Sequence, residues 1–104
     1  MLTIRKGEAS RTAPAQDEYL PRIAVAEDDG VLSCAFSGVW TTRTVADIDA
    51  QMRNLEKRNG FKILALDLSN IEKMDTAGAW LIDRLAKVYR AKGADIRMRG
   101  ASEI

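Results

Sequence analysis

The sequence predicts an α/β fold in which helices pack against a mixed sheet, and three features support this prediction. An alternating segment at 22–27 runs through an Asp-Asp-Gly turn into the apolar segment 31–36, which is typical of a β-hairpin. Segment 61–68 is apolar at nearly every position and lies between two stretches of helical periodicity, as a parallel strand between crossover helices does. Segment 95–99 alternates again and predicts a fourth strand.

The composition restricts the class of protein. The 104 residues, 46% hydrophobic and 30% charged, suffice for one domain with a modest core. A formal net charge of +1 gives no general attraction to nucleic acid or anionic membranes. Histidine, the commonest general base and metal ligand, is absent. We therefore expect no catalytic site, no metal site and no cofactor.

Cysteine use and hydropathy predict a cytoplasmic domain. The single cysteine, Cys34, stands in an apolar segment, where a free cysteine is usually a small buried residue, and this fits a reducing compartment. No stretch approaches the ~20 apolar residues of a transmembrane helix. No apolar region follows Arg5 and Lys6, so we expect no secretory signal.

The expected domain boundaries follow from periodicity. Residues 1–21 mix glycine, proline and both charge signs without a period, so we expect a tail that is disordered up to about Asp17. The folded domain is expected over 22–104. A helix is expected to begin at Ser102, close to the end of the sequence. Because the last strand would otherwise lack its cover, we expect a truncated C-terminal helix and a longer full-length protein.

The first helix is predicted to start at Thr44, a favoured N-cap, with Asp47 completing a capping-box-like pair. Asn59-Gly60 is expected to end this helix, and Ser37–Trp40 to leave the strand before it. The central strand 61–68 is expected to be covered on both faces. The apolar face of the helix is formed by Val45, Ile48, Met52 and Leu55.

The second helix is predicted over 76–91, joined to the central strand through 69–74 and closed by Lys92-Gly93. Its charged side carries Trp80, together with Asp83, Arg84, Lys87 and Arg90. Its apolar side is formed by Gly78, Leu81, Ile82, Leu85, Val88 and Tyr89. Trp80 is therefore either a partner anchor or covered by the first turn, the tail or the 38–44 connector, and the sequence favours neither.

The start of this helix combines several signals. Asp75 or Thr76 is expected to cap the free amides of the first turn. A threonine hydroxyl at a helix N-terminus is also a favourable place for phosphate, although the Asp75 carboxylate would oppose it. Glycine weakens a helix by ~1 kcal/mol, so Gly78 indicates that another part of the chain packs closely there.

The C-terminal third is basic, with one acid, Asp95, among six cations. The cations are Arg84, Lys87, Arg90, Lys92, Arg97 and Arg99. Nucleic-acid binding would require aromatic residues able to stack, but Tyr89 lies on the apolar side of the helix. We expect a solvated helix face without nucleic-acid binding. A weak contact with acidic headgroups or an acidic partner stays open.

Four short motifs, in this order and spacing, resemble the STAS family (sulfate transporter and anti-sigma factor antagonist). They are Phe36-Ser37-Gly38-Val39-Trp40, Leu66-Asp67-Leu68-Ser69, Asp75-Thr76-Ala77-Gly78 and the helix end Ala91-Lys92-Gly93. The resemblance covers about residues 22–104. It implies a STAS fold, with a four- to five-stranded mixed sheet packed by helices, that acts by docking and has no catalytic apparatus.

Within this family, Asp-Thr-Ala-Gly-Ala-Trp followed by Leu is most similar to the N-terminal STAS domain of permeases in bacterial lipid-trafficking (Mce-type) ABC transporters. Trp40 and the tail are similar to that group too. The resemblance implies that the start of the second helix contacts the ATPase subunit, and that only a further C-terminal part of the full-length permease enters the membrane. The implied partner-binding residues are Asp75, Thr76, Ala77, Gly78, Trp80 and Arg84.

Two functions stay open from the sequence. The first is a regulatory or assembly domain of an ABC transporter permease. The second is a free-standing anti-sigma factor antagonist that a partner kinase phosphorylates on Thr76, the position of the family's switch. A continuation past Ile104 into several ~20-residue apolar helices would favour the first. An enzyme is not expected, because a paired-carboxylate site would have only Asp67 and Asp75, and Asp67 is expected to accept backbone hydrogen bonds.

Overall fold

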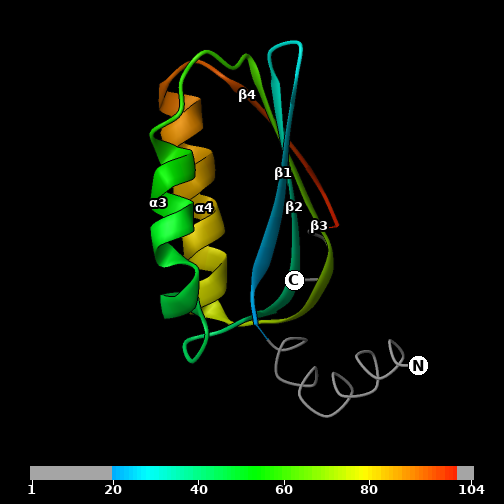
Figure 1. Ribbon diagram of the computed structural model, residues 1–104, viewed down its shortest axis with the longest axis vertical. Coiled ribbons are helices and arrows are strands. Elements are labelled where there is room, and N and C mark those ends of the chain that lie inside the picture. The colour runs from blue at the N-terminus through cyan, green and yellow to red at the C-terminus, as the bar shows by residue number, and fades with distance from the viewer. Residues whose placement is uncertain (1–19, 101–104) are drawn as a thin grey trace, which may run out of the picture.

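The computed structural model describes residues 20–100, in which two α-helices lie on one side of a four-stranded sheet (Figure 1). The elements are β1 (Arg22–Asp28), β2 (Val31–Trp40), the 3₁₀ turn η1 (Val45–Asp47), α3 (Asp49–Glu56), β3 (Ile63–Met74), α4 (Thr76–Ala91) and β4 (Asp95–Arg99). The tail expected up to Asp17 and the helix expected from Ser102 lie outside the described residues.

The sheet has the order β1-β2-β3-β4. β1 is antiparallel to β2, whereas β2, β3 and β4 run parallel, each joined to the next through a helix. The predicted mixed α/β sheet is confirmed. The hairpin between β1 and β2 turns through Asp29 and Gly30, both with positive φ, which matches the twist of the two strands.

β2 and β3 are longer than predicted. The sequence predicts that Ser37–Trp40 leaves the strand and that 69–74 is a connector, and both predictions are wrong. The two extensions pair with each other, Val39 with Lys73 and Trp40 with Met74, past two register shifts. Pairing between two strands that are distant in the sequence does not alter the hydrophobic pattern of either strand. The hydrophobic period alone therefore could not predict that β2 and β3 extend along each other.

The first helix starts later than predicted, because Thr44 does not cap it. The Thr44 hydroxyl donates to the Val39 carbonyl at 2.7 Å and accepts from the Thr41 backbone N–H at 3.0 Å. No side-chain cap forms there, so the capping box with Asp47 is wrong, and a 3₁₀ turn precedes the α-helix. The predicted apolar face does meet the core, with Ile48, Met52 and Leu55 buried and Val45 partly buried.

α3 also ends before the predicted Asn59-Gly60, at Glu56. The Lys92 ammonium donates to the carbonyl groups of Glu56 and Arg58 at 2.6 and 2.7 Å. These carbonyls lie at and beyond the helix end, where no intrahelical partner is available. A lysine from the end of α4 therefore supports the end of α3.

The core lies between the helices and one face of the sheet. Along β3, Leu64, Leu66 and Leu68 are buried, whereas Ala65 and Asp67 on the other face are only partly buried. The expectation that this strand is covered on both faces is wrong within residues 20–100, because both helices pack on the same face. The segment is apolar at nearly every position because Ile63 and Ala65 also occupy the open face.

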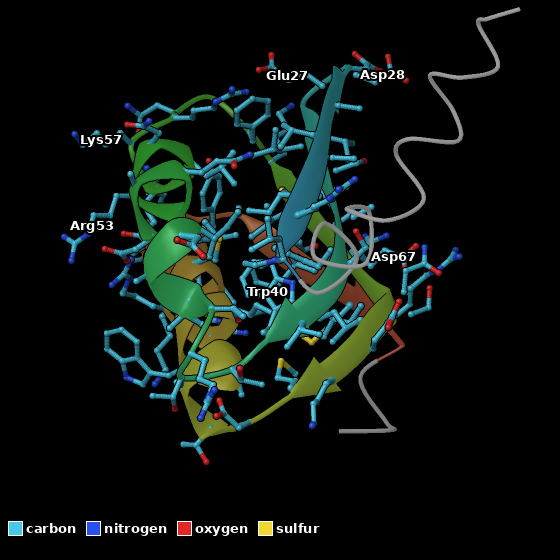
Figure 2. All side chains as sticks on the ribbon, turned by 60° about the horizontal axis from the view of Figure 1, so that its bottom comes forward. Glu27, Asp28, Trp40, Arg53, Lys57 and Asp67 are labelled. Carbon is cyan, nitrogen blue, oxygen red and sulfur yellow. The ribbon has the colours of Figure 1, made fainter. Side chains whose placement is uncertain are left out.

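Trp40 is the largest fully buried side chain, and it determines how closely α4 approaches the sheet. Its indole donates to the Ser37 carbonyl at 2.9 Å and packs edge-on against Phe36 with 5.2 Å between ring centres. Figure 2 places Trp40 between the helices and the sheet, while Arg53 and Lys57 project outward. The first turn of α4 rests on the backbone of Trp40 through Gly78. A Cβ at Gly78 would lie 2.0 Å from the Trp40 carbonyl oxygen, which confirms the close packing predicted there.

Gly78→Ala is expected to lower the free energy of unfolding by about 2 kcal/mol, because the added methyl group forces α4 off β2. Helix propensity alone predicts a gain of ~1 kcal/mol. Urea denaturation measures the free energy of unfolding of both proteins. The variant Ala79→Gly, in the same turn, measures how much this helix prefers alanine to glycine where no close contact is involved. A Gly78→Ala variant more stable than wild type would contradict the close approach.

Candidate functional site

Asp75 joins three parts of the chain at the start of α4. Its Oδ1 accepts hydrogen bonds from the backbone N–H groups of Ala77 and Gly78 at 2.9 and 3.2 Å, as an N-cap does. Its Oδ2 accepts from the backbone N–H and the hydroxyl of Thr42 at 2.9 and 3.0 Å. Its own N–H donates to the Trp40 carbonyl at 3.2 Å. Of the two predicted caps, Asp75 is the one that forms.

These hydrogen bonds lower the pKa of the Asp75 carboxyl below its ordinary value. The Thr42 backbone N–H is the largest cause, the Gly78 and Ala77 N–H groups add to it, and desolvation opposes it. The carboxylate is therefore ionised at neutral pH. Sequence reasoning missed Thr42, which lies 33 residues from Asp75. The only signal for it was the threonine-rich connector that follows Trp40.

Thr76, the first residue of α4, is exposed. Within residues 20–100 no hydrogen bond involves its hydroxyl. This hydroxyl is therefore accessible from solvent. The first-turn amides of Ala77 and Gly78, however, already donate to Asp75. A phosphate on Thr76 would thus meet an ionised carboxylate rather than free amides.

Trp80 is 57% exposed. Neither the first turn of α4 nor the 38–44 connector covers it, and the tail named as a third possible cover lies outside the described residues. One ring face lies against the Arg84 guanidinium, whose Cζ is 5.1 Å from the ring centre. A large aromatic surface thus stands one turn from Thr76 on an otherwise polar helix face.

The helical periodicity predicts Arg84 on the solvated side of the helix, but its side chain is only 20% exposed. It donates to Glu56 at 2.6 Å and to Asp49 at 3.3 Å, both on the α3 side of the helix pair. The site residues of the sequence prediction therefore fall into two groups. Asp75, Ala77 and Gly78 fix the start of α4, and Thr76 and Trp80 are exposed beside them, with Arg84 under the indole.

The basic residues of the C-terminal third do not form one surface. Lys87 pairs with Asp83 on the outer side of α4 at 3.0 Å, and Lys92 supports the end of α3. Arg97 and Arg99 line the opposite, open face of the sheet. Among the described residues of α4, the predicted solvated face holds for Lys87 and Arg90, which are exposed, and fails for Arg84.

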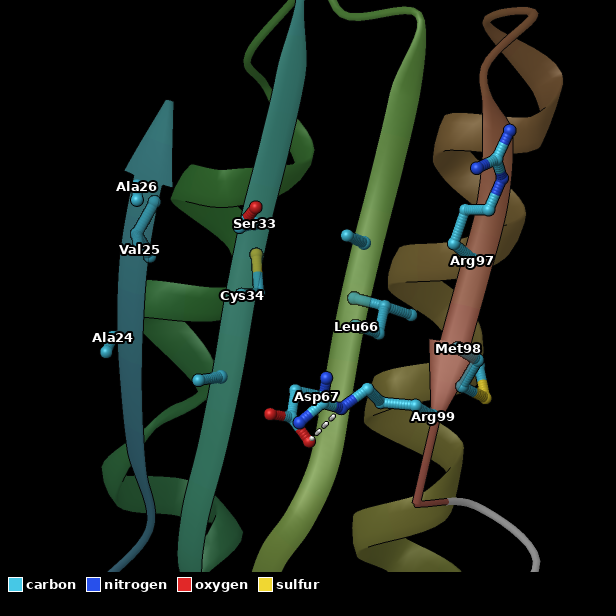
Figure 3. Close-up of a pocket in the computed structure, with 12 residues that line it drawn as sticks. Ala24, Val25, Ala26, Ser33, Cys34, Leu66, Asp67, Arg97, Met98 and Arg99 are labelled. Atoms are coloured by element: carbon cyan, nitrogen blue, oxygen red, sulfur yellow. Dashed lines mark ion pairs between the residues drawn. The ribbon is translucent and has the colours of Figure 1, made fainter. Parts of the chain in front are cut away.

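The open face of the sheet carries a shallow hollow of about 460 Å³ (Figure 3). Its floor consists of small side chains, which are Ala24, Ala26, Ser33, Ala35 and Ala65. Asp67 lies in it, accepts from the backbone N–H and hydroxyl of Ser69 at 3.0 and 2.6 Å, and pairs with Arg99 at 3.5 Å. The expected backbone hydrogen bond of Asp67 is confirmed.

The two carboxylates that the sequence offers as a catalytic pair do not lie together, and the single cysteine is buried. Asp67 and Asp75 are eight positions apart along and just beyond β3, or roughly 26 Å at strand spacing, so they do not form a carboxylate pair. Cys34 is buried, as predicted, and burial raises the pKa of its thiol to about 11. Residues 20–100 contain no cluster of three or more metal-ligand side chains.

The STAS domain model matches residues 22–104. The chain belongs to the STAS family. STAS domains are typically regulatory modules without catalytic activity, and the predicted STAS fold is confirmed. No curated protein matches the chain. None of the helices in the described part of the chain is long and apolar enough to cross a membrane.

Several solved structures share this fold. The anti-sigma factor antagonist STAS domain from Rhodobacter sphaeroides superposes with a TM-score of 0.66 at 17% identity, over 81% of this chain and 90% of that one. An anti-sigma factor antagonist from Mycobacterium paratuberculosis gives 0.57 at 20% identity, over 75% and 65%. SLC26A9 gives 0.55 at 11% identity, over 88% of this chain and 20% of that one. At these identities the likeness concerns the fold.

Asp75→Ala is expected to lower the urea midpoint at pH 7, because the variant loses both the helix cap and the link to Thr42. The pKa of this carboxyl is lowered on folding. Its stabilisation is therefore complete above the ordinary value of about 3.9 and disappears as pH falls through the folded-state pKa.

Urea denaturation from pH 7 down to pH 3 measures this effect, and the gap between wild type and variant should narrow below about pH 4. Asp83→Ala, which removes an exposed carboxylate of the same helix, serves as the control and should change little at either pH. A gap that stays constant over this range would contradict the role of the ionised carboxylate.

Proposed function

We propose that this STAS domain is an assembly module that docks through the start of α4. The docking surface comprises the exposed Thr76 and Trp80, with Asp75 and Arg84 as the residues that hold them. The observation that carries the proposal is the 57% exposure of Trp80 on a polar helix face. Tryptophan is enriched at binding hot spots, where one side chain contributes about 2 kcal/mol or more.

The rigidity of the surrounding backbone supports the same proposal. Asp75 ties the start of α4 to Thr42, and Gly78 lets it rest directly on Trp40. A surface that is already fixed loses less conformational freedom on binding, so more of the contact energy appears as affinity. Asp75, Ala77 and Gly78 then act mainly as the base of the docking surface, and Thr76 and Trp80 as its contacts.

The setting we propose is the permease of a lipid-trafficking ABC transporter, with the ATPase subunit as the partner on the cytoplasmic side of the membrane. The sequence from Asp75 to Leu81 supports this setting, since its Asp-Thr-Ala-Gly-Ala-Trp-Leu pattern resembles that group. A STAS region can be a small part of a large chain, as the match to 20% of the SLC26A9 chain illustrates. A gene that continues past Ile104 into ~20-residue apolar helices would agree with it.

Trp80→Ala is expected to weaken binding of the purified ATPase subunit at least about tenfold, because a hot-spot side chain contributes about 2 kcal/mol or more. The melting temperature should change little, since the indole is mostly exposed. Calorimetric titration and thermal unfolding measure the two effects. Lys87→Ala, a second exposed change on the same helix, should leave binding unchanged. A large loss of stability in Trp80→Ala would instead assign the indole to the core.

The second candidate is an anti-sigma factor antagonist controlled by phosphorylation of Thr76. The exposed, unbonded hydroxyl of Thr76 favours it. Likeness to anti-sigma factor antagonist structures adds support. The partner would then be a kinase that also acts as anti-sigma factor.

Under this candidate, mass spectrometry of the protein from native cells should find phosphate on Thr76. Thr76→Glu should weaken docking, because a further negative charge stands beside the ionised Asp75, whereas Thr76→Ser should dock as wild type does. Thr76 that stays unmodified under all growth conditions would rule out the switch and leave it a contact residue.

A further inference from the structure

The charge of Arg84 is neutralised within the domain. Its Nε donates to Glu56 Oε2 at 2.6 Å and its Nη2 to Asp49 Oδ1 at 3.3 Å. The side chains of Arg84 and Glu56 are 20% and 16% exposed, so solvent and salt screen this pair only in part. Arg53 completes the cluster by donating to the second Asp49 oxygen at 2.8 Å.

The guanidinium of Arg84 also contacts the docking surface. It lies over the Trp80 ring, with Cζ 5.1 Å from the ring centre. The two residues are four positions apart on α4, where side chains lie one above the other. A cation over an indole face is attracted by the ring quadrupole. The carboxylates of Asp49 and Glu56 thus hold the cation, and the cation holds the indole.

We propose that Arg84 is a positioning residue, which the α3 carboxylates Asp49 and Glu56 fix so that Trp80 is oriented before a partner binds. This inference rests on the proposed docking function and deepens it. It also names the partner chemistry, which is an apolar pocket for the indole. An acidic patch of a partner that approached Arg84 would meet a guanidinium already paired with the carboxylates of Asp49 and Glu56. An anchor held in place loses less side-chain freedom on binding.

The first arm of the test needs no partner. The protein is labelled with 5-fluorotryptophan, and the Trp80→Phe variant assigns the two fluorine resonances to Trp40 and Trp80. The double variant Asp49→Asn/Glu56→Gln keeps side-chain size and removes both charges. Its Trp80 resonance should narrow and move towards that of free fluorotryptophan, while the Trp40 resonance stays in place.

The matched control is Asp83→Asn, which neutralises a carboxylate of α4 that pairs with Lys87. It should leave both resonances where they are in wild type. A Trp80 resonance that does not move in the double variant would overturn the positioning role of Arg84.

The second arm measures affinity for the purified ATPase subunit. Loss of one held side chain should weaken binding about two- to tenfold in the double variant, and Asp83→Asn should have no effect. If Arg84 met an acidic partner directly, freeing it would leave affinity unchanged or raise it, and this outcome overturns the inference. If Trp80→Ala itself binds as wild type does, the proposed function fails, and the fluorine spectra still decide whether Arg84 positions Trp80.

Discussion

The position of α4 depends on one carboxylate. Asp75 accepts four hydrogen bonds, two from the first turn of α4 and two from Thr42 in the connector after β2. Directly beneath it, Gly78 allows the helix backbone to rest on that of Trp40. The helix start, the connector and the end of β2 are thereby fixed to one another. Any side chain at 78 would meet the Trp40 carbonyl, and loss of the carboxyl group at 75 would remove all four hydrogen bonds.

Two tryptophans have opposite roles around this point. Trp40 is fully buried and supports the helix from within the core, where its indole N–H is satisfied by Ser37. Trp80 is exposed on the outer side of the same helix and lies against Arg84. A docking module requires a fixed backbone, which the buried Trp40 supports, and an exposed anchor side chain, for which we propose Trp80. The two candidate carboxylates do not form a pair, since Asp67 lies within β3 and Asp75 follows its end.

The sequence predicted features that depend on neighbouring residues. Both α4 and β4 have the predicted bounds, because Asp75 and the glycine after the helix, Gly93, are local signals. The extensions of β2 and β3 were not predicted because each extension is a strand only by pairing with the other. The links from Thr42 to Asp75 and from Arg84 to Asp49 were missed for the same reason, since they join residues 33 and 35 positions apart.

The central claim is that the start of α4 is the surface that meets the partner. The most direct measurement is photo-crosslinking in living cells, with p-benzoylphenylalanine in place of Trp80 in the full-length protein. We expect a covalent adduct with the ATPase subunit from position 80 and none from position 24, where Ala24 lies on the open face of the sheet. An adduct with that subunit from position 24 and none from position 80 would contradict it.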